Sequence, residues 1–269
     1  MRRFRLPPLG AVVFVAASIG SAAVGSAQES AGVAVAVVQS TSIEGAAGEG
    51  QVLLAEAPVF SGDRILTDAT GEAQIRFRDD TRLVVGPNSS IVIDQFVFAG
   101  DSSLQVASIS ALRGTLRFIT GTGSKDSYSV STPTATIGFR GSATDITVED
   151  DGTTTIAQLE DETELCRRRE DDGTVETEEE RRRRCAVVMP GCSIFVTGAG
   201  RDPEEIEEQS EKNLAVLRRL RYVRDQRSLV AGFQLDVAAC GVFANSGGSL
   251  NPLLLVPGVL IVPAIPISP

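Results

Sequence analysis

The chain carries few of the side chains on which enzyme active sites depend. Its 269 residues include no His and only two Lys, and the formal net charge is −10. Without an imidazole group, Ser-His-Asp triads, Cys-His pairs and histidine-ligated zinc sites are excluded. The carboxylates fall in charge runs, whereas tuned acid–base pairs stand apart in contrasting surroundings. We therefore expect no enzymatic activity and no cofactor.

Two short segments could still suggest a bound ion or phosphate. Glu149-Asp150-Asp151-Gly152 is acidic but lacks the D-x-[DN]-x-[DN]-G pattern of a calcium loop. The run Gly121-Thr122-Gly123 is not followed by a helix, as a phosphate cradle would be. Both segments are therefore interpreted as turns, with no metal site, and the acidic balance argues against binding to nucleic acid.

Four cysteines are the remaining reactive side chains. They are Cys166, Cys185, Cys192 and Cys240. An even number of cysteines in an exported protein favours two disulfides, and of the three connectivities we favour Cys166–Cys185 with Cys192–Cys240. A zinc site is the alternative, although the chain has no C-x-x-C pair.

Export is indicated by the first residues. Three arginines precede an apolar run over residues 9–24, and small residues at Gly25 and Ala27 satisfy the rule for signal-peptide cleavage. We expect residues 1–27 to be a signal peptide that is removed before Gln28, so that no transmembrane helix remains. An uncleaved N-terminal anchor is the alternative, but the apolar run is shorter than a spanning helix needs.

The body of the chain, residues 28–200, is predicted to be a β domain. Residues 72–78 alternate between polar and apolar side chains, Asp79-Asp80 forms a tight turn, and residues 81–85 return as the next strand. Further strands are expected at residues 33–38, 90–94, 112–119, 127–130, 143–148 and 153–159. This spacing predicts a mainly β fold, an antiparallel β roll or sandwich of many short strands.

An ordered set of segments resembles the FecR-type periplasmic domain family. Residues 62–67, 73–77 and 83–93 resemble the opening of that domain, and residues 112–118 resemble its glycine-marked strand. Residues 131–142 are similar to its signature TP-x-A-x-IG-x-RGT, with Ser142 in place of the final Thr. The matching signature residues are Thr132, Pro133, Ala135, Ile137, Gly138, Arg140 and Gly141. The resemblance covers about residues 55–160.

Elementary stereochemistry accounts for the signature. Pro133 fixes its own backbone and holds Thr132 extended, while Gly138 and Gly141 permit bends or a close approach of backbone. Arg140 lies between the two glycines and can donate several hydrogen bonds to carbonyls or a carboxylate. We expect Arg140 to be a buried structural donor; a contact with a ligand or partner is the alternative.

Three further segments depart from the β pattern. Residues 160–184 are densely charged and are expected to form a hairpin that turns at residues 171–173, closed by Cys166 and Cys185; a disordered loop is the alternative. Residues 201–231 are expected to hold one helix over residues 202–230, with Asp202 as N-cap and Pro203 at the first position. The apolar, proline-rich tail, residues 232–269, cannot form a continuous membrane-spanning helix. It is expected to lie on the body, to extend freely or to contact a partner.

The resemblance implies a non-enzymatic periplasmic recognition domain. In the signalling members of the family, such a domain follows a cytoplasmic anti-sigma segment and a membrane helix. Here a signal peptide leads directly into the domain, so we expect a stand-alone binding or scaffolding module linked to envelope signalling. The alternatives are a structural cell-envelope or secreted adhesin-type protein and, third, a hydrolase. The expected location is periplasmic or secreted, and the expected partner is another envelope protein or a cell-wall component.

Overall fold

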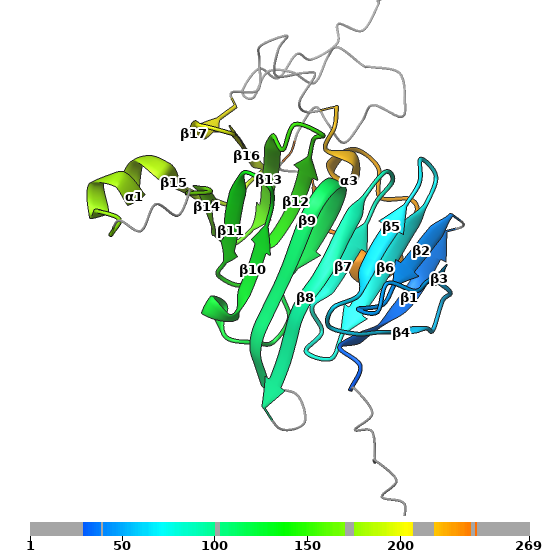
Figure 1. The fold of residues 1–269 in the computed structure, drawn as a ribbon. Coiled ribbons are helices and arrows are strands. Elements are labelled where there is room, and N and C mark those ends of the chain that lie inside the picture. The colour runs from blue at the N-terminus through cyan, green and yellow to red at the C-terminus, as the bar shows by residue number, and fades with distance from the viewer. Residues whose placement is uncertain are drawn as a thin grey trace, which may run out of the picture.

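The chain folds as a β sandwich with one extra layer, as a computed structural model shows for residues 29–38, 40–99, 103–169, 175–206, 218–237 and 240 (Figure 1). One sheet, here called sheet A, has the strand order β4–β1–β6–β7–β9–β12–β13–β16–β17. The other, sheet B, has the order β3–β2–β5–β8–β9–β10–β11–β14–β15. The long strand β9 belongs to both sheets and joins them. The predicted mainly β fold is confirmed.

The described strands and helices have the following bounds. The first half of the chain contains β1 Gly32–Val38, β2 Thr41–Glu44, β3 Gly50–Val52, β4 Pro58–Val59, β5 Arg64–Thr67, β6 Glu72–Phe77, β7 Arg82–Val85, β8 Ser90–Ala99 and β9 Ser103–Ile119. The second half contains η1 Lys125–Ser127, β10 Tyr128–Ser131, β11 Ala135–Phe139, β12 Ala143–Val148, β13 Thr154–Glu160, β14 Thr163–Arg167, α1 Glu178–Arg184, β15 Cys185–Val188, β16 Ser193–Gly198, β17 Arg201–Glu205, α3 Arg221–Arg224 and η2 Ala231–Phe233.

The chain crosses between the two sheets at residues with a left-handed backbone. Most crossings have such a residue, at Ser40, Glu56, Gly62, Asn88, Gly114, Gly141, Asp161, Gly191 and Cys192. A positive φ turns an extended chain sharply, and glycine, asparagine and aspartate tolerate it best. In strand β9 the bend places residues 103–113 in sheet B and residues 114–119 in sheet A. The sequence marks these corners with small or polar residues.

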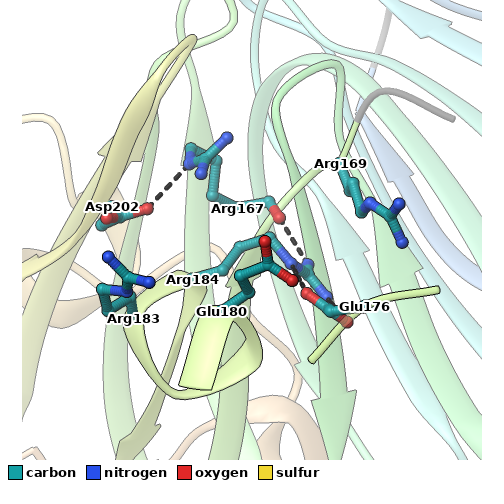
Figure 2. A pocket seen from close by; sticks show the side chains of 7 residues that line it. All are labelled: Arg167, Arg169, Glu176, Glu180, Arg183, Arg184 and Asp202. Atoms are coloured by element: carbon teal, nitrogen blue, oxygen red, sulfur yellow. Dashed lines mark hydrogen bonds and ion pairs between the residues drawn. The ribbon is translucent and has the colours of Figure 1, made fainter. Parts of the chain in front are cut away.

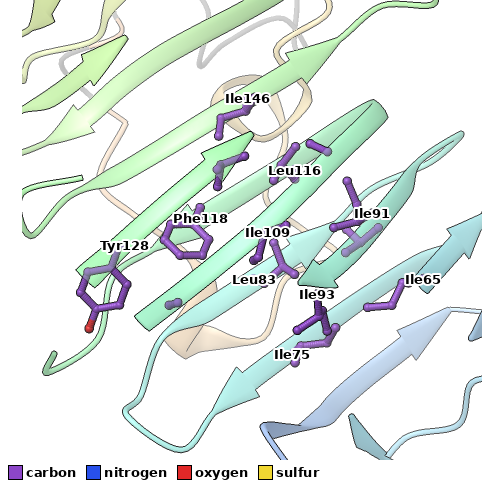
Figure 3. Packing of buried hydrophobic residues seen from close by; sticks show 14 of the residues in the cluster. Ile65, Ile75, Leu83, Ile91, Ile93, Ile109, Leu116, Phe118, Tyr128 and Ile146 are labelled. Atoms are coloured by element: carbon purple, nitrogen blue, oxygen red, sulfur yellow. The ribbon is translucent and has the colours of Figure 1, made fainter. Parts of the chain in front are cut away.

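The main core lies between the facing surfaces of the two sheets. Ile75, Leu83 and Phe118 from sheet A meet Ile93 and Ile109 from sheet B, and all five side chains are fully or almost fully buried (Figure 3). Burying a side chain of this size contributes about 1.5–3 kcal/mol. The alternation seen in the sequence placed these residues on the inner face, as expected for strands with a period of two.

A third layer covers the outer face of sheet A. It consists of residues 218–237 and Cys240, here called the strap, and appears in orange behind the strands in Figure 1. Leu220 and Val223 pack with Ala157 and Ile194, and Phe233 packs with Val84. Strand β12 is covered by the core on one face and by the strap on the other. All six of its residues are therefore buried, and the alternation of exposed polar and buried apolar residues is lost.

The predicted helix over residues 202–230 is wrong at its start. Arg201–Glu205 forms strand β17, which pairs antiparallel with β16, so Asp202 and Pro203 do not begin a helix. Farther on, α3 spans only four residues, and residues 225–230 are not helical. Antiparallel pairing with the preceding strand β16, in a local hairpin, overrides the capping pattern of this segment. Residues 207–217 of the expected helix lie outside the described residues.

Other predictions fall partly or wholly outside the described residues. These are the signal peptide with its cleavage site, the turn at residues 171–173 and the tail after Cys240. Within the described part of the chain, no helix has the length and apolar character needed to cross a membrane.

Candidate functional site

The described part of the densely charged segment forms an arm at one end of the sandwich, here defined as residues 163–169 and 175–188. Strands β14 and β15 pair antiparallel, and Cys166 lies directly opposite Cys185. A disulfide joins these two residues, and a second joins Cys192 to Cys240. Both predicted pairings are confirmed, and the sulfur atoms that a zinc site would need are used in these bonds. The described part of the connection differs from a simple hairpin because it contains helix α1.

Helix α1 is stabilised by interactions among its own residues and its N-cap. The Thr177 side chain accepts a hydrogen bond from the Glu180 amide, and the Glu180 carboxylate accepts one from the Thr177 amide. This reciprocal capping box supports the first turn, where three glutamates also suit the positive end of the helix dipole. Four arginines occupy the negative end. No residue of α1 is buried, so the helix adds nothing to the hydrophobic core.

A charged pocket of about 350 Å³ lies where the arm meets β17 (Figure 2). Its lining residues are Arg167, Arg169, Glu176, Glu180, Arg183, Arg184 and Asp202. Arg167 donates from Nε to the Asp202 carboxylate at 2.8 Å and therefore ties β14 to β17. Arg184 donates to both carboxylate oxygens of Glu176, at 2.6 and 2.9 Å, and to the Arg167 carbonyl at 2.6 Å.

These contacts favour the ionised forms of Glu176, Glu180 and Arg184. The hydrogen bond from Arg184 lowers the pKa of the Glu176 carboxyl, and the hydrogen bond from the Thr177 amide lowers that of Glu180. The pairing with Glu176 likewise raises the pKa of Arg184. A general acid needs a carboxyl whose pKa is raised toward neutrality, which is the opposite shift. The arrangement suits recognition of charged groups on a partner rather than proton transfer.

The signature residues build one corner of the sandwich at some distance in sequence from the arm. Thr132 closes the turn between β10 and β11, because its side chain accepts from the Ala135 amide at 2.9 Å. The Thr132 hydroxyl also contacts that of Thr154 at 2.8 Å, and thereby links the turn to β13. Ala135 and Ile137 are fully buried, whereas Pro133 is exposed at the turn. These residues act as scaffold.

The two signature glycines differ in what they require. Gly141 has φ = +83° and lies at the crossing from β11 to β12, so the expected bend is confirmed there. At Gly138, a Cβ atom would meet nothing within 4 Å, and the backbone is not left-handed. The expectation of a bend or close approach at Gly138 is therefore wrong.

The expectation that Arg140 is a buried donor is also wrong. Its side chain is 54% exposed and pairs with the Glu162 carboxylate at 3.0 Å across the surface. The guanidinium does reach a carboxylate, but in water, where such a pair contributes little to folding. The exposed guanidinium is accessible to a ligand or partner, as the alternative requires.

Among the described residues, the fully buried arginine is Arg117, which sequence reasoning did not single out. Its side chain is fully buried and donates to both carboxylate oxygens of Asp145, at 2.6 and 2.9 Å. Arg117 also donates to Gln226 and to the Phe233 carbonyl in the strap. The two charged residues face each other in the register of β9 and β12. The sequence offered one signal for this pair, namely an arginine and an aspartate in two segments that were both predicted to be strands.

Comparison with known proteins identifies part of the sandwich. Residues 63–163 match the family model described as FecR protein, which confirms the resemblance for this segment. No curated protein matches the chain. Two crystal structures of "a putative anti-sigma factor" from Parabacteroides distasonis align at 11% identity with a TM-score of 0.39. Each alignment covers 57% of this chain and 64% or 63% of the other, so the chain spans less than two thirds of their length. The likeness is too distant to indicate a shared function.

Proposed function

We propose that the protein is a non-enzymatic, exported binding or scaffolding module of the cell envelope, linked to envelope signalling, that docks a partner protein through its charged arm. The single observation that carries the proposal is the construction of the arm. It is fixed by a disulfide, a capping box and ion pairs, yet α1 buries no residue. An element held in place without serving the core is suited to making contacts outside the molecule.

Export is supported by the cysteine chemistry. All four cysteines of the chain are paired in two disulfides. Disulfides form and persist in oxidising compartments and are rare in the cytosol. The FecR match over residues 63–163 is consistent with a periplasmic or secreted location. N-terminal sequencing of protein from the producing cell should begin at Gln28, whereas recovery of an intact Met1 in the membrane fraction would contradict cleavage.

Docking through the arm is testable by neutralising charges that the fold does not need. The Arg182 and Arg183 side chains are 76% and 67% exposed and make only long i,i+4 contacts with glutamates of the same helix. R182Q/R183Q keeps good helix formers at both positions but removes two positive charges. The matched control, R64Q/R113Q, removes two exposed positive charges from β5 and β9.

Affinity capture from envelope extracts then separates the candidate functions. We expect wild type and R64Q/R113Q to recover the same envelope protein, and R182Q/R183Q to recover at least about tenfold less of it. Equal recovery by the arm variant would refute docking through the arm. Retention on cell-wall glycan, with no specific protein recovered, would favour the structural cell-envelope role instead.

A further inference from the structure

The strap covers sheet A without becoming part of it. It contains the short turns α3 and η2, and its described residues form no strand pairing with the sheet. A segment outside the ladder can leave without breaking the backbone hydrogen bonds that hold the sheet together. The described strap is therefore held to the sheet by side-chain contacts and not by a backbone ladder.

Polar side chains of sheet A bind the backbone of the strap. Gln74 contacts it with both ends of its amide: it donates to the Ser228 carbonyl and accepts from the Val230 amide, both at 2.9 Å. Three other side chains donate to strap carbonyls, namely Arg82 to Gly232, Arg117 to Phe233 and Thr147 to Arg219. Contacts of this kind recognise an extended peptide through its main chain, whatever its side chains are.

Apolar sockets on the same face accept particular strap side chains. Tyr222 is fully buried, and its hydroxyl donates to the Glu72 carboxylate at 3.0 Å. Phe233 and Leu229 are 3% and 4% exposed and join Tyr222 in one cluster. Backbone recognition by polar groups, combined with sockets for large apolar side chains, is how peptide-binding surfaces obtain affinity and specificity.

The interface is also unusually polar for a layer of a folded core. The sheet contributes Glu72, Gln74, Arg117 and Asp145 to it, all almost fully buried beneath the strap. Charged and amide groups lose their hydration when they are covered, so a face made of them tolerates contact with water better than an apolar one. A surface that the strap covers only part of the time is expected to be rich in such polar groups.

We propose that the outer face of sheet A is a peptide-binding surface whose resident occupant is the chain's own strap, latched in place by the Cys192–Cys240 disulfide. Cys192 lies at the crossing from β15 to β16, and Cys240 lies at the end of the described strap. The bond fixes the end of the strap to the body, so that the segment returns to its face after each local opening. Tethering of this kind gives the cis occupant a high effective concentration.

Removal of the latch by serine substitution in the full-length protein tests the proposal. The test variant is C192S/C240S, and its matched control is C166S/C185S, which removes the disulfide of the arm instead. Hydrogen–deuterium exchange reports local opening through the amides of Val230 and Leu235, which donate to side chains of Gln74 and Gln226. We expect exchange at these amides to rise at least about tenfold in the test variant and to remain at the wild-type rate in the control.

A probe peptide tests whether the uncovered face binds in trans. The probe has the sequence of residues 218–237 with a fluorescent label, and the control peptide carries Ser at the positions of Tyr222 and Phe233. We expect saturable binding of the probe to C192S/C240S, and binding at least about tenfold weaker to the wild type. The control peptide should also bind C192S/C240S at least about tenfold more weakly than the probe.

Unchanged exchange of the strap amides together with no probe binding would overturn the proposal. If C192S/C240S fails to fold, Q74A decides, because it removes side-chain contacts with the strap and leaves every cysteine in place. Faster exchange confined to the strap in Q74A supports a separable layer, whereas exchange that rises equally throughout the sandwich refutes it. None of these readouts depends on the arm, so their outcome is distinct from that of the capture experiment.

Discussion

Arg117 shows how the chain can bury a full charge within a β sandwich. Its guanidinium is matched by both oxygens of Asp145 and is covered by the strap. Loss of one partner from such a pair leaves the other buried and uncompensated, which costs about 3–5 kcal/mol. We therefore expect D145A to lower the free energy of unfolding by about this amount, measured by urea denaturation. R140A, which removes an exposed arginine, serves as the comparison.

The surface pair of Arg140 and Glu162 is open to solvent, with Arg140 54% exposed. Substitutions of this kind usually alter stability by less than about 0.5 kcal/mol. An R140A variant that is as unstable as D145A would contradict the assignment of Arg117, rather than Arg140, as the structural arginine. Unchanged stability of R140A with lost partner binding would place Arg140 in a recognition surface.

The two tyrosines give the protein a defined response to alkaline pH. Burial, followed by the hydrogen bond to Asp79, raises the pKa of Tyr128 to about 12, and burial also raises the pKa of Tyr222. An unfolded tyrosine ionises near pH 10. A raised pKa in the folded state means that stability is fully present below about pH 10 and is lost as the pH rises toward 12.

Ultraviolet titration can check this response directly, because the chain has two Tyr and no Trp. The native protein should show little phenolate absorbance at about pH 10, where the unfolded chain is about half ionised. The urea midpoint of the wild type should fall between about pH 10 and 12, and Y128F should show a smaller fall. Normal ionisation of both phenols in the native protein would contradict the buried environment of Tyr128.

At the scale of the element, the bend within β9 depends on one glycine. Gly114 has φ = +101° and is the point where β9 passes from sheet B to sheet A. A Cβ atom at this position would lie 2.1 Å from the Ser89 Oγ and 2.4 Å from the Ser89 Cα. Strained backbone and a clash with the main chain act together, so we expect G114A to lose about 3 kcal/mol or more.

Gly138 provides the matched control in the same sandwich. Its backbone is unstrained, and a Cβ atom would meet nothing within 4 Å. G138A should therefore leave the thermal midpoint unchanged or slightly raised, since alanine costs less chain entropy than glycine in a strand. Equal losses in G114A and G138A would show that sheet crossing is not what Gly114 is needed for.

The elements also show where sequence reasoning works and where it fails. Strand β12 was predicted with its observed bounds because its flanking residues mark turns and its composition suits a strand. The segment beginning at Asp202 carried a convincing helix start but pairs as β17 with β16. The true capping box, from Thr177 to Glu180, lay unnoticed in the charged insertion. A capping pattern indicates a possible helix start, but a hairpin with the preceding strand can use the same residues instead.

At the scale of the whole molecule, the position of the strap over sheet A could not be predicted from the hydrophobic pattern of the sequence. Polar residues such as Gln74 and Asp145 alternate with apolar ones, which ordinarily indicates a solvent-facing surface. The strap covers them instead, and the sequence distance from Gln74 to Ser228 hides the contact that explains their burial. The presence of two disulfides was predictable from the even cysteine count and the expected export, which left three connectivities, and the favoured one is confirmed.

The two disulfides should differ in what they contribute to the whole molecule. Their sequence separations are 19 and 48 residues. In the chain-entropy model, these loops correspond to stabilisation of about 3 kcal/mol for Cys166–Cys185 and about 4 kcal/mol for Cys192–Cys240, because the longer loop restricts the unfolded chain more. In urea denaturation, C192S/C240S should therefore have a lower free energy of unfolding than C166S/C185S. The difference should grow beyond the loop-length term if release of the latch also loosens the strap over the buried Arg117 pair. The reverse order would mean that the arm, and not the strap, couples its disulfide to the stability of the sandwich.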